Sequence, residues 1–302
     1  MLRLLPALLF CLTACGEDNN AVKVHYPEPV IKMLTTQVIN DVYETSEKTI
    51  RDGVSLYEIG CYNNLKRTHF FIVKADLTKV TFTSSTPNDK PELPTAVGGD
   101  AQIPVHAGAA EANGKKVWVA FNGDFWTGNP GKPMGLFFKD GIALNTKIYE
   151  GHTEVVYMMK DGTVGIGQHA EIEKQYDQIL HAVGGRGHLI QNGNVRDVSD
   201  IITDGRNPRT TIGLSKDKNT LYVFVIDGRR SWYSEGMELN DVSALMASVG
   251  CHDAINLDGG GSSTLVVRGE ETELVDFPVV NKPSDASGAR KIANGILIIN
   301  KK

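Results

Sequence analysis

Residues 256–265 read NLDGGGSSTL, a string that combines an acid, hydroxyl side chains and a flexible backbone. It contains three consecutive glycines, Gly259, Gly260 and Gly261. Glycine loses the most conformational freedom on folding, so a run of glycines predicts a tight turn, here between two apolar strands. Backbone N–H groups of such a turn, with Asp258 before them and Ser262 after them, could hold an anion beside a carboxylate. A plain β-turn capped by Asp258 is the alternative.

Other polar residues occur where the hydrophobic pattern predicts strand ends. They are Asn122 and Asp124, Arg209 and Thr210, and Asp227 and Arg229. A strand that turns sharply exposes its last polar side chain, and glycine lets a substrate approach the backbone. A hairpin turn is the simpler interpretation of any single Asp-Gly pair, but their joint occurrence with Arg209 favours a site. An arginine binds two phosphate oxygens at once, so we expect a substrate with an anion next to the bond to be cleaved.

These motifs, taken together, resemble the phosphodiester glycosidase family. The matching strings are Asn122-Gly123-x-Phe125, Arg209-Thr210-x-x-Gly213 and residues 256–264, in the same order and with similar spacing. The resemblance covers roughly residues 50–300 and includes the closing segment 289–295. One departure is visible, because the family usually reads Asn-Gly-x-Phe-Phe and Trp126 stands in the last place. Asp124 falls on the variable position, so the resemblance supports it less than Asn122.

The resemblance implies cleavage between the anomeric carbon of a sugar and a phosphodiester oxygen. Phosphate is a weakly basic leaving group, so neutralising its charge matters more than protonating it. Arg209, with the N–H groups of residues 259–262, is expected to do this. A carboxylate must still act at the anomeric carbon, and Asp258 is the first candidate and Asp227 the second. Asn122 is expected to hold a sugar hydroxyl or acetamido group.

Further residues are expected to bind the substrate or its phosphate: Gly259, Gly260, Gly261, Ser262, Asp124, Thr210 and Arg229. Two other functions stay open at this point. The protein could be a phosphodiesterase that cuts the P–O bond of the same substrates, or a non-catalytic glycan-binding lipoprotein. The sequence leaves open the sugar, the aglycone and whether the anomeric configuration is retained or inverted.

Neither a cofactor nor nucleic acid is expected. The eight histidines show no metal-binding spacing such as His-Glu-x-x-His, so no metal ligand is predicted. A structural Ca²⁺ held by Asp side chains and loop carbonyls is an open alternative. The formal net charge of −5 gives no electrostatic reason to bind nucleic acid. The partners expected are a carbohydrate phosphodiester and, through a lipid, a membrane.

The hydrophobic pattern predicts that the elements that position these residues are mainly strands. Segments 54–59, 69–76 and 80–84 alternate or are apolar and predict an opening antiparallel meander. Helices are predicted at 101–113 and 237–249, each ending at a glycine. No linker or repeat is visible after residue 45. We therefore expect an α+β, β-rich single domain of mostly antiparallel or mixed sheet, with a few helices packed against it.

The first residues predict where the protein is located and do not belong to the folded domain. Residues 1–14 resemble a bacterial lipoprotein signal peptide, with cleavage before Cys15 and a lipid on its sulfur. An ordinary signal cut nearby, or a start-site artefact, is the alternative. Residues 15–45 would be a linker and lead-in, and 46–302 the glycosidase-like domain, anchored in the cell envelope outside the cytoplasmic membrane. The later cysteines, Cys61 and Cys251, are read as two free thiols in preference to a disulfide.

Overall fold

Antiparallel sheets dominate the computed structural model, which describes residues 26–199, 205–269 and 275–301. The largest sheet has eight strands and carries most of the polar strand ends noted above. Its order is β1 (Asn40–Arg51), β2 (Val54–Asn63), β3 (Lys66–Asp76), β16 (Thr220–Ile226), β15 (Arg209–Ser215), β17 (Cys251–Asn256), β13 (His188–Gln191) and β14 (Asn194–Val195).

Two smaller sheets and a ribbon complete the strand structure of the described residues. The five-stranded sheet has the order β11 (Val164–Gln168), β10 (Glu154–Met159), β12 (Ile179–Gly185), β8 (Phe137–Lys139) and β9 (Ile142–Asn145). The four-stranded sheet has the order β18 (Leu265–Val267), β5 (Val117–Asn122), β19 (Gly295–Asn300) and β4 (Val80–Ser85). The ribbon pairs β6 (Trp126–Thr127) with β7 (Lys132–Pro133).

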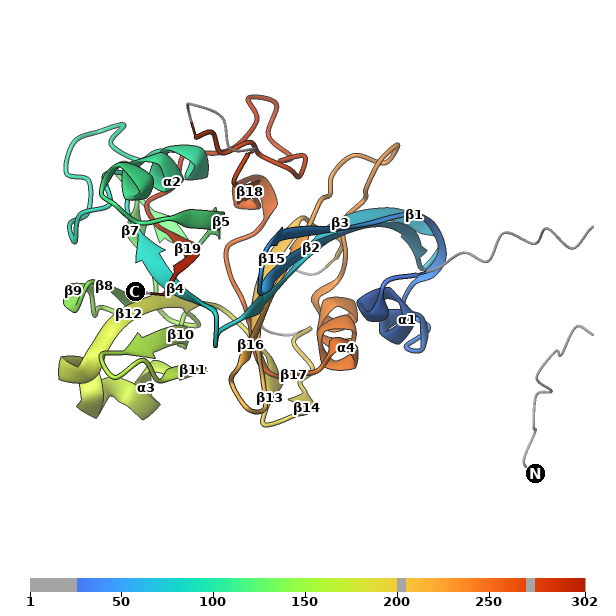
Figure 1. Cartoon of the computed structure of the whole chain (residues 1–302), viewed down its shortest axis with the longest axis horizontal. Coiled ribbons are helices and arrows are strands. Elements are labelled where there is room, and N and C mark those ends of the chain that lie inside the picture. The colour runs from blue at the N-terminus through green and yellow to red at the C-terminus, as the bar shows by residue number, and fades with distance from the viewer. Residues whose placement is uncertain (1–25, 200–204, 270–274, 302) are drawn as a thin grey trace, which may run out of the picture.

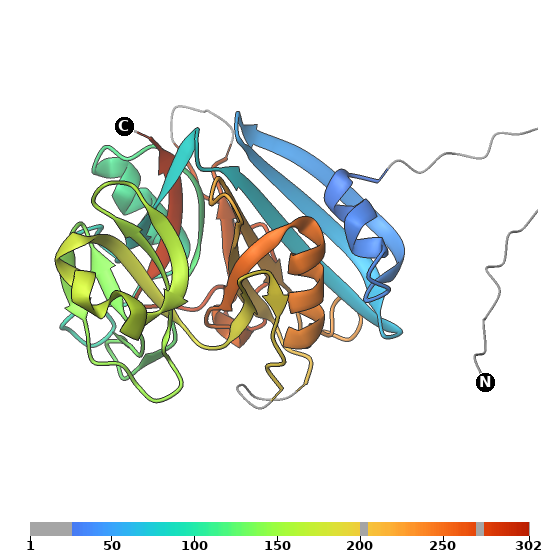
Figure 2. The ribbon, with the colours of Figure 1, turned by 90° about the horizontal axis from the view of Figure 1, so that it is seen from below.

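The central part of the eight-stranded sheet packs against a core on each face, and successive side chains of its strands point alternately into the two cores. In β3, Phe71 and Val73 join a core shared with strands of the two smaller sheets. Phe70 and Ile72 point to the other face, which α1 (Glu28–Leu34) and α4 (Leu239–Val249) cover (Figures 1 and 2). Both faces of the central strands β3, β15 and β16 are therefore buried, which fixes their register strongly, whereas β1 and β14 at the edges are largely exposed.

The smaller sheets have helices of their own. Helix α2 (Ile103–Ala112) packs on the four-stranded sheet, with Ala107 and Ala110 fully buried. Helix α3 (His169–Ile172) and the 3₁₀ helix η1 (Glu173–Gln178) cover part of the five-stranded sheet. A further 3₁₀ turn, η2 (Gly260–Ser262), lies between β17 and β18. The predicted β-rich α+β fold, mostly antiparallel with a few packed helices, is confirmed.

One prediction about topology is wrong. Strands β2 and β3 pair as expected, but β4 does not extend that meander and instead pairs with β19 in the four-stranded sheet. The reason is that β16 occupies the open edge of β3 through seven paired residues. Both predicted helices are present, and α4 ends at Gly250, whose φ of 108° lies in the left-handed region that glycine favours.

The N-terminal part of the described chain contributes to the core. Helix α1 lies within the predicted lead-in, and its Val30 and Met33 are fully buried. The predicted signal peptide and Cys15 lie outside the described residues. Cys61 and Cys251 are both buried and free, as expected. Within the described ranges, no helix has the length and apolar composition needed to cross a bilayer.

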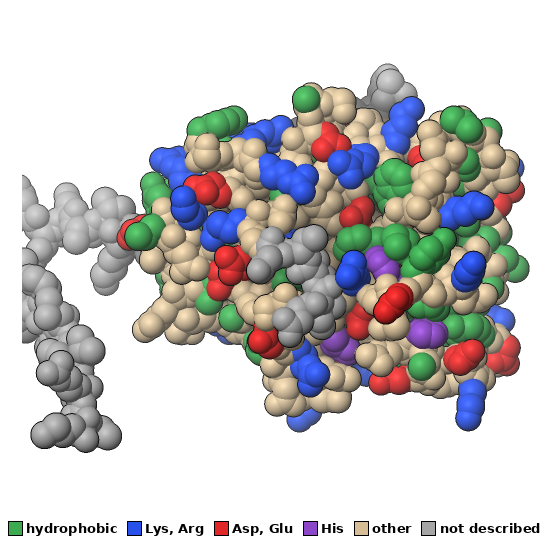
Figure 3. All heavy atoms as spheres, turned by 180° about the vertical axis from the view of Figure 1, so that it is seen from behind, with side chains coloured by type: hydrophobic (Ala, Val, Ile, Leu, Met, Phe, Trp, Pro, Cys, Tyr) green, Lys and Arg blue, Asp and Glu red, His purple; other side chains and the backbone are tan. Residues whose placement is uncertain are grey.

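Charge is mixed on the surface that Figure 3 shows. Lys and Arg side chains are interspersed there with Asp and Glu. This face therefore offers no continuous basic stripe of the kind that follows a nucleic-acid backbone.

Candidate active site

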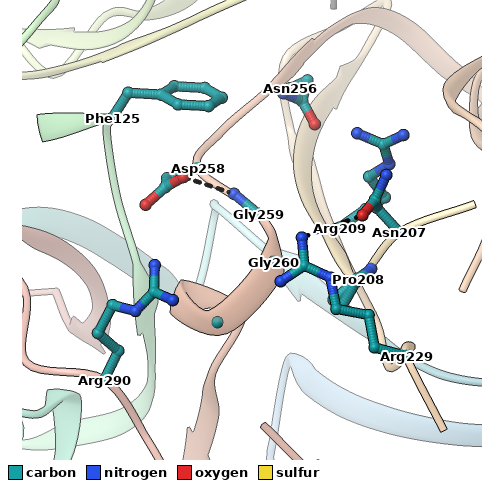
Figure 4. Close-up of a pocket in the computed structure, with 11 residues that line it drawn as sticks. Phe125, Asn207, Pro208, Arg209, Arg229, Asn256, Asp258, Gly259, Gly260 and Arg290 are labelled. Atoms are coloured by element: carbon teal, nitrogen blue, oxygen red, sulfur yellow. Dashed lines mark hydrogen bonds between the residues drawn. The ribbon is translucent and has the colours of Figure 1, made fainter. Parts of the chain in front are cut away.

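The ends of β15, β16 and β17 meet at a cavity of about 330 Å³ (Figure 4). Six residues proposed from the sequence line it: Arg209, Arg229, Asp258, Gly259, Gly260 and Gly261. Strand pairing brings them together, because β15 lies between β16 and β17 in the eight-stranded sheet. Three segments that are far apart in the sequence therefore each contribute to the wall of the cavity.

The glycine turn lets two arginines approach the backbone. Gly260 has a φ of 61°, and a Cβ at this residue would lie 3.1 Å from the guanidinium of Arg229. A Cβ on Gly261 would lie 2.2 Å from the side chains of Arg290 and Asp285, so any other residue there would displace this ion pair. Gly260 and Gly261 therefore leave room for charged side chains, and Gly259 leaves room for the Pro208 carbonyl, which a Cβ would approach to 2.8 Å.

Most N–H groups of the turn are already used by the protein. Gly259 N–H donates to Oδ1 of Asp258 at 2.9 Å, and Gly260 N–H donates to the Pro208 carbonyl at 3.0 Å. The N–H groups of Ser262 and Ser263 donate to the carbonyls of Gly259 and Gly260. These amides hold the turn in shape. The arginine side chains are consequently better placed than the turn amides to neutralise an anion.

Asp258 is the acidic side chain of the pocket. Its N–H donates to the Gly123 carbonyl at 3.0 Å, which fixes the backbone immediately before the turn. Burial raises the pKa of Asp258 to about 6, and the Ser262 hydroxyl, the Gly259 N–H and the charge of Arg290 oppose that rise. In Figure 4 the carboxylate lies between the ring of Phe125 and the guanidinium of Arg290.

The Ser262 hydroxyl is close to Asp258 but does not line the cavity. Its oxygen is buried and forms no hydrogen bond of good geometry with the described residues, so it acts on Asp258 as a nearby dipole. The expectation that Ser262 binds phosphate stays a prediction.

Asn122 and Thr210 lie beneath the pocket rather than in its lining. The Asn122 amide donates to the Asp258 carbonyl at 2.7 Å and accepts from the Thr210 hydroxyl at 2.8 Å and the Thr264 N–H at 3.1 Å. These bonds tie β5, β15 and the glycine turn together. The geometry favours a positioning role for both side chains rather than contact with a sugar.

The carboxylate of Asp227 is hydrogen-bonded within the protein, and Asp227 does not line the cavity. Its carboxylate accepts from Asn281 Nδ2 at 2.9 Å, the Lys282 N–H at 3.0 Å and the Tyr233 hydroxyl at 3.1 Å. Burial raises the pKa of Asp227 to about 6, and these donors oppose the rise. The geometry therefore supports Asp258 over Asp227 as the carboxylate that faces the substrate.

Asp124 is buried next to the site. Its Oδ2 accepts from the Gly135 N–H at 2.6 Å, while its Oδ1 has no partner among the described residues. Burial raises the pKa of Asp124 to about 8, the Gly135 N–H opposes this, and the negative charge of Asp258 adds to it. The pKa of Asp124 is therefore raised further than the pKa of Asp258, so Asp124 holds its proton to higher pH than Asp258 does.

Guanidinium groups give the pocket a positive field. Arg209 donates to the carbonyls of Met237 at 3.2 Å and Gly205 at 2.8 Å, and burial together with the like charge of Arg229 lowers its pKa to about 10. Arg229 is exposed and donates to Asn207 Oδ1 at 3.1 Å. Within the described part of the chain, neither arginine forms an ion pair with a carboxylate. Neither charge is therefore neutralised by a described carboxylate, and the exposed Arg229 is the more accessible of the two to an anionic ligand.

Five lining residues were not among the predicted site residues: Phe125, Asn207, Pro208, Asn256 and Arg290. Arg290 pairs with Asp285 at 2.8 Å and stands opposite the other two arginines across the turn (Figure 4). A signal existed for three of them, because Phe125, Asn256 and Arg290 belong to the strings that carry the family resemblance. Nothing in the sequence pattern distinguished Asn207 or Pro208.

Solved structures share this fold. The catalytic domain of zebrafish N-acetylglucosamine-1-phosphodiester α-N-acetylglucosaminidase, auto-inhibited by its pro-peptide, is 22% identical with a TM-score of 0.56, covering 88% of this chain and 84% of that one. A hypothetical protein from Synechocystis is 11% identical with a TM-score of 0.55, covering 86% and 64%. A putative exported protein from Burkholderia pseudomallei is 13% identical with a TM-score of 0.55, covering 84% and 96%.

The sequence itself identifies the family. Residues 115–299, more than half of the chain, match the phosphodiester glycosidase family, and the chain belongs to this family. An uncharacterised SPbeta prophage-derived protein of Bacillus subtilis, YomE, is 26% identical over 312 residues. That match covers 94% of this chain but 47% of the relative, so the chain spans about half the length of the curated relative that it matches.

Proposed function

We propose that the protein is a hydrolase that cleaves the bond between the anomeric carbon of a sugar and a phosphodiester oxygen. The observation that carries this proposal is the single acidic side chain of the pocket lining, Asp258, facing a cavity that Arg209, Arg229 and Arg290 also line. Arg209 and Arg229, which form no ion pair among the described residues, suit a phosphodiester, and one carboxylate suits the positive charge that develops at an anomeric carbon. Membership of the family supports the same reaction class.

In the proposed reaction, the arginines of the pocket act on the phosphate and the carboxylate acts on the sugar. Arg209 and Arg229 hold the phosphate and stabilise the negative charge that builds on it as the C–O bond breaks. Asp258 stabilises the oxocarbenium-like transition state from the sugar side. Phe125 offers an apolar surface beside that carboxylate (Figure 4). The products are a free sugar, whose new hydroxyl comes from water, and a phosphate monoester.

A panel of synthetic sugar-1-phosphodiesters tests this activity. We expect NMR to detect free sugar and phosphate monoester released from at least one α- or β-linked substrate. Binding of the panel without turnover would instead favour a glycan-binding protein. Release of sugar 1-phosphate and an alcohol would favour cleavage of the distal P–O bond by a phosphodiesterase.

We also propose that the enzyme acts on glycan material outside the cytoplasmic membrane, tethered by a lipid on Cys15. The support is the signal-like segment that ends at this cysteine. Labelling of the full-length protein with radioactive palmitate, compared with a Cys15→Ala variant, tests the anchor. We expect label in the wild type and none in the variant. Equal labelling of both proteins would exclude Cys15 as the attachment site.

A further inference from the structure

A second group of polar side chains lies outside the pocket, on the neighbouring strands β1, β2 and β3. Glu44, Glu58 and His69 each present one ligand atom, and these atoms lie within 4.8 Å of one another. His69 Nε2 is 3.3 Å from Glu58 Oε1 and 3.7 Å from Glu44 Oε2. None of the three lines the cavity around Asp258. The group therefore has no part in the proposed glycosidase reaction.

The spacing of these atoms suits a tetrahedral metal ion. Zinc bonds to His nitrogen and carboxylate oxygen are about 2.0–2.2 Å long, which places neighbouring ligand atoms roughly 3.3–3.5 Å apart. The two distances from His69 Nε2 fall at or near this range. Only a small adjustment of Glu44, whose side chain is exposed, would complete the set.

The hydrogen bonds on the other side of the imidazole set its tautomer. The Tyr233 hydroxyl lies 2.6 Å from His69 Nδ1 and donates to Asp227 Oδ2 at 3.1 Å. A hydroxyl has one proton, so a Tyr233 that donates to Asp227 must accept from His69 Nδ1–H. In the neutral imidazole, His69 Nε2 then carries a lone pair, which faces the carboxylates of Glu58 and Glu44.

A lone pair facing two carboxylates is repulsive unless a cation lies between them. The neutral imidazole, with its proton on Nδ1, does not supply that cation itself. Lys282 is the other positive charge nearby, but its Nζ lies over the Tyr233 ring, 3.7 Å from the ring centroid. The carboxylate–tyrosine–histidine chain has the form of the outer-shell support that orients metal-binding histidines.

We propose that Glu44, Glu58 and His69 bind a divalent transition-metal ion of the zinc class, with water completing its coordination. One imidazole and two carboxylates suit zinc better than calcium or magnesium, which prefer oxygen ligands alone. The ion would fasten β1 and β2 to His69, and through Tyr233 and Asp227 to the segment that carries Arg229. This differs from the metal-free chain expected from the sequence and does not depend on the glycosidase activity.

Zinc titration of the purified, chelator-treated full chain tests the site. We expect one equivalent of Zn²⁺ to bind, measured by calorimetry and by metal analysis after desalting, and to raise the Tm. Glu58→Gln and Glu44→Gln each remove one charged ligand and should weaken binding at least about 100-fold. Tyr233→Phe keeps the ring but removes the hydroxyl, and should weaken binding about 10–100-fold, as outer-shell changes do.

Glu47→Gln is the matched control. Glu47 lies on β1 three residues after Glu44 and is exposed, and the alternation of side chains turns it to the opposite face. This variant should bind zinc like the wild type, and circular dichroism should show that all four variants fold. Absence of stoichiometric zinc in the wild type would overturn the proposal. So would wild-type affinity in both Glu44→Gln and Glu58→Gln, because the zinc would then bind elsewhere.

Discussion

The Asn122 side-chain amide donates to the backbone carbonyl of Asp258 at 2.7 Å and so connects β5 of one sheet to the glycine turn that follows β17 of another. Its carbonyl oxygen accepts from Thr210 and from the N–H of Thr264. Asn122 is 1% exposed, so these bonds are shielded from water. The pocket is therefore built on a buried junction between two sheets.

Asn122→Ala should destabilise the protein by about 2–4 kcal/mol, because buried donors and acceptors lose their partners. The measurement is urea unfolding, and activity at a temperature where the variant is folded should also fall because Asp258 is displaced. Thr210→Val, which removes only one of the three bonds, should cost less. Unchanged stability in Asn122→Ala would refute the positioning role.

Asp258→Asn should lower kcat about 10²–10⁴-fold, the range typical for loss of a catalytic acid or base. The amide oxygen can still accept from the Gly259 N–H, so the Tm should change little. Asp177→Asn, at an exposed residue of η1, is the control and should keep full activity. Near-normal turnover in Asp258→Asn would remove this carboxylate from the mechanism.

Arg229→Gln should raise KM roughly 10–100-fold, which corresponds to the loss of a hydrogen bond to a charged group. Arg229 is exposed, and its described hydrogen bond goes to Asn207, so the free energy of unfolding should hardly change. Steady-state kinetics at two salt concentrations is the measurement, because salt screens an exposed charge. Lys160→Gln, in the exposed turn after β10, should leave KM unchanged. The same KM in both variants would show that Arg229 does not bind the phosphate.

Asp124→Asn should change how stability depends on pH. The pKa of Asp124 is raised to about 8 in the folded state, so the folded protein binds more protons there than the unfolded chain. The wild type therefore loses stability as the pH rises from about 4 to 8, since its buried carboxyl must ionise. The variant cannot ionise, so its free energy of unfolding should fall less over this range. Parallel pH profiles for the two proteins would contradict the burial of a protonated Asp124.

Much of the fold could be predicted from the sequence because individual strands and helices are encoded by local patterns of apolar residues and glycines. Strands such as β3 and β16 alternate or are continuously apolar, and α4 ends at a glycine that the left-handed region requires. The position of β4 could not be predicted in this way. Its pattern fits either sheet, and the choice depends on β16, which returns from far along the chain to pair with β3.

The candidate site was predictable where a motif marked it. Asp258 and the glycines carry such a motif, and the structure places them in the pocket with Arg209. Strand-end position alone did not separate Asp227 from Asp258, because only the fold shows that Asn281, Lys282 and Tyr233 surround Asp227. Glu44, Glu58 and His69 were missed for a similar reason, since cross-strand neighbours have no fixed spacing in sequence.

The proposed reaction breaks the C–O bond at the anomeric carbon. Product analysis alone does not prove this, because cleavage of the adjacent P–O bond releases the same sugar and the same phosphate monoester. Hydrolysis in H₂¹⁸O, followed by mass spectrometry of both products, separates the two reactions. We expect ¹⁸O on the anomeric hydroxyl of the sugar and none on the phosphate. Label on the phosphate would contradict it.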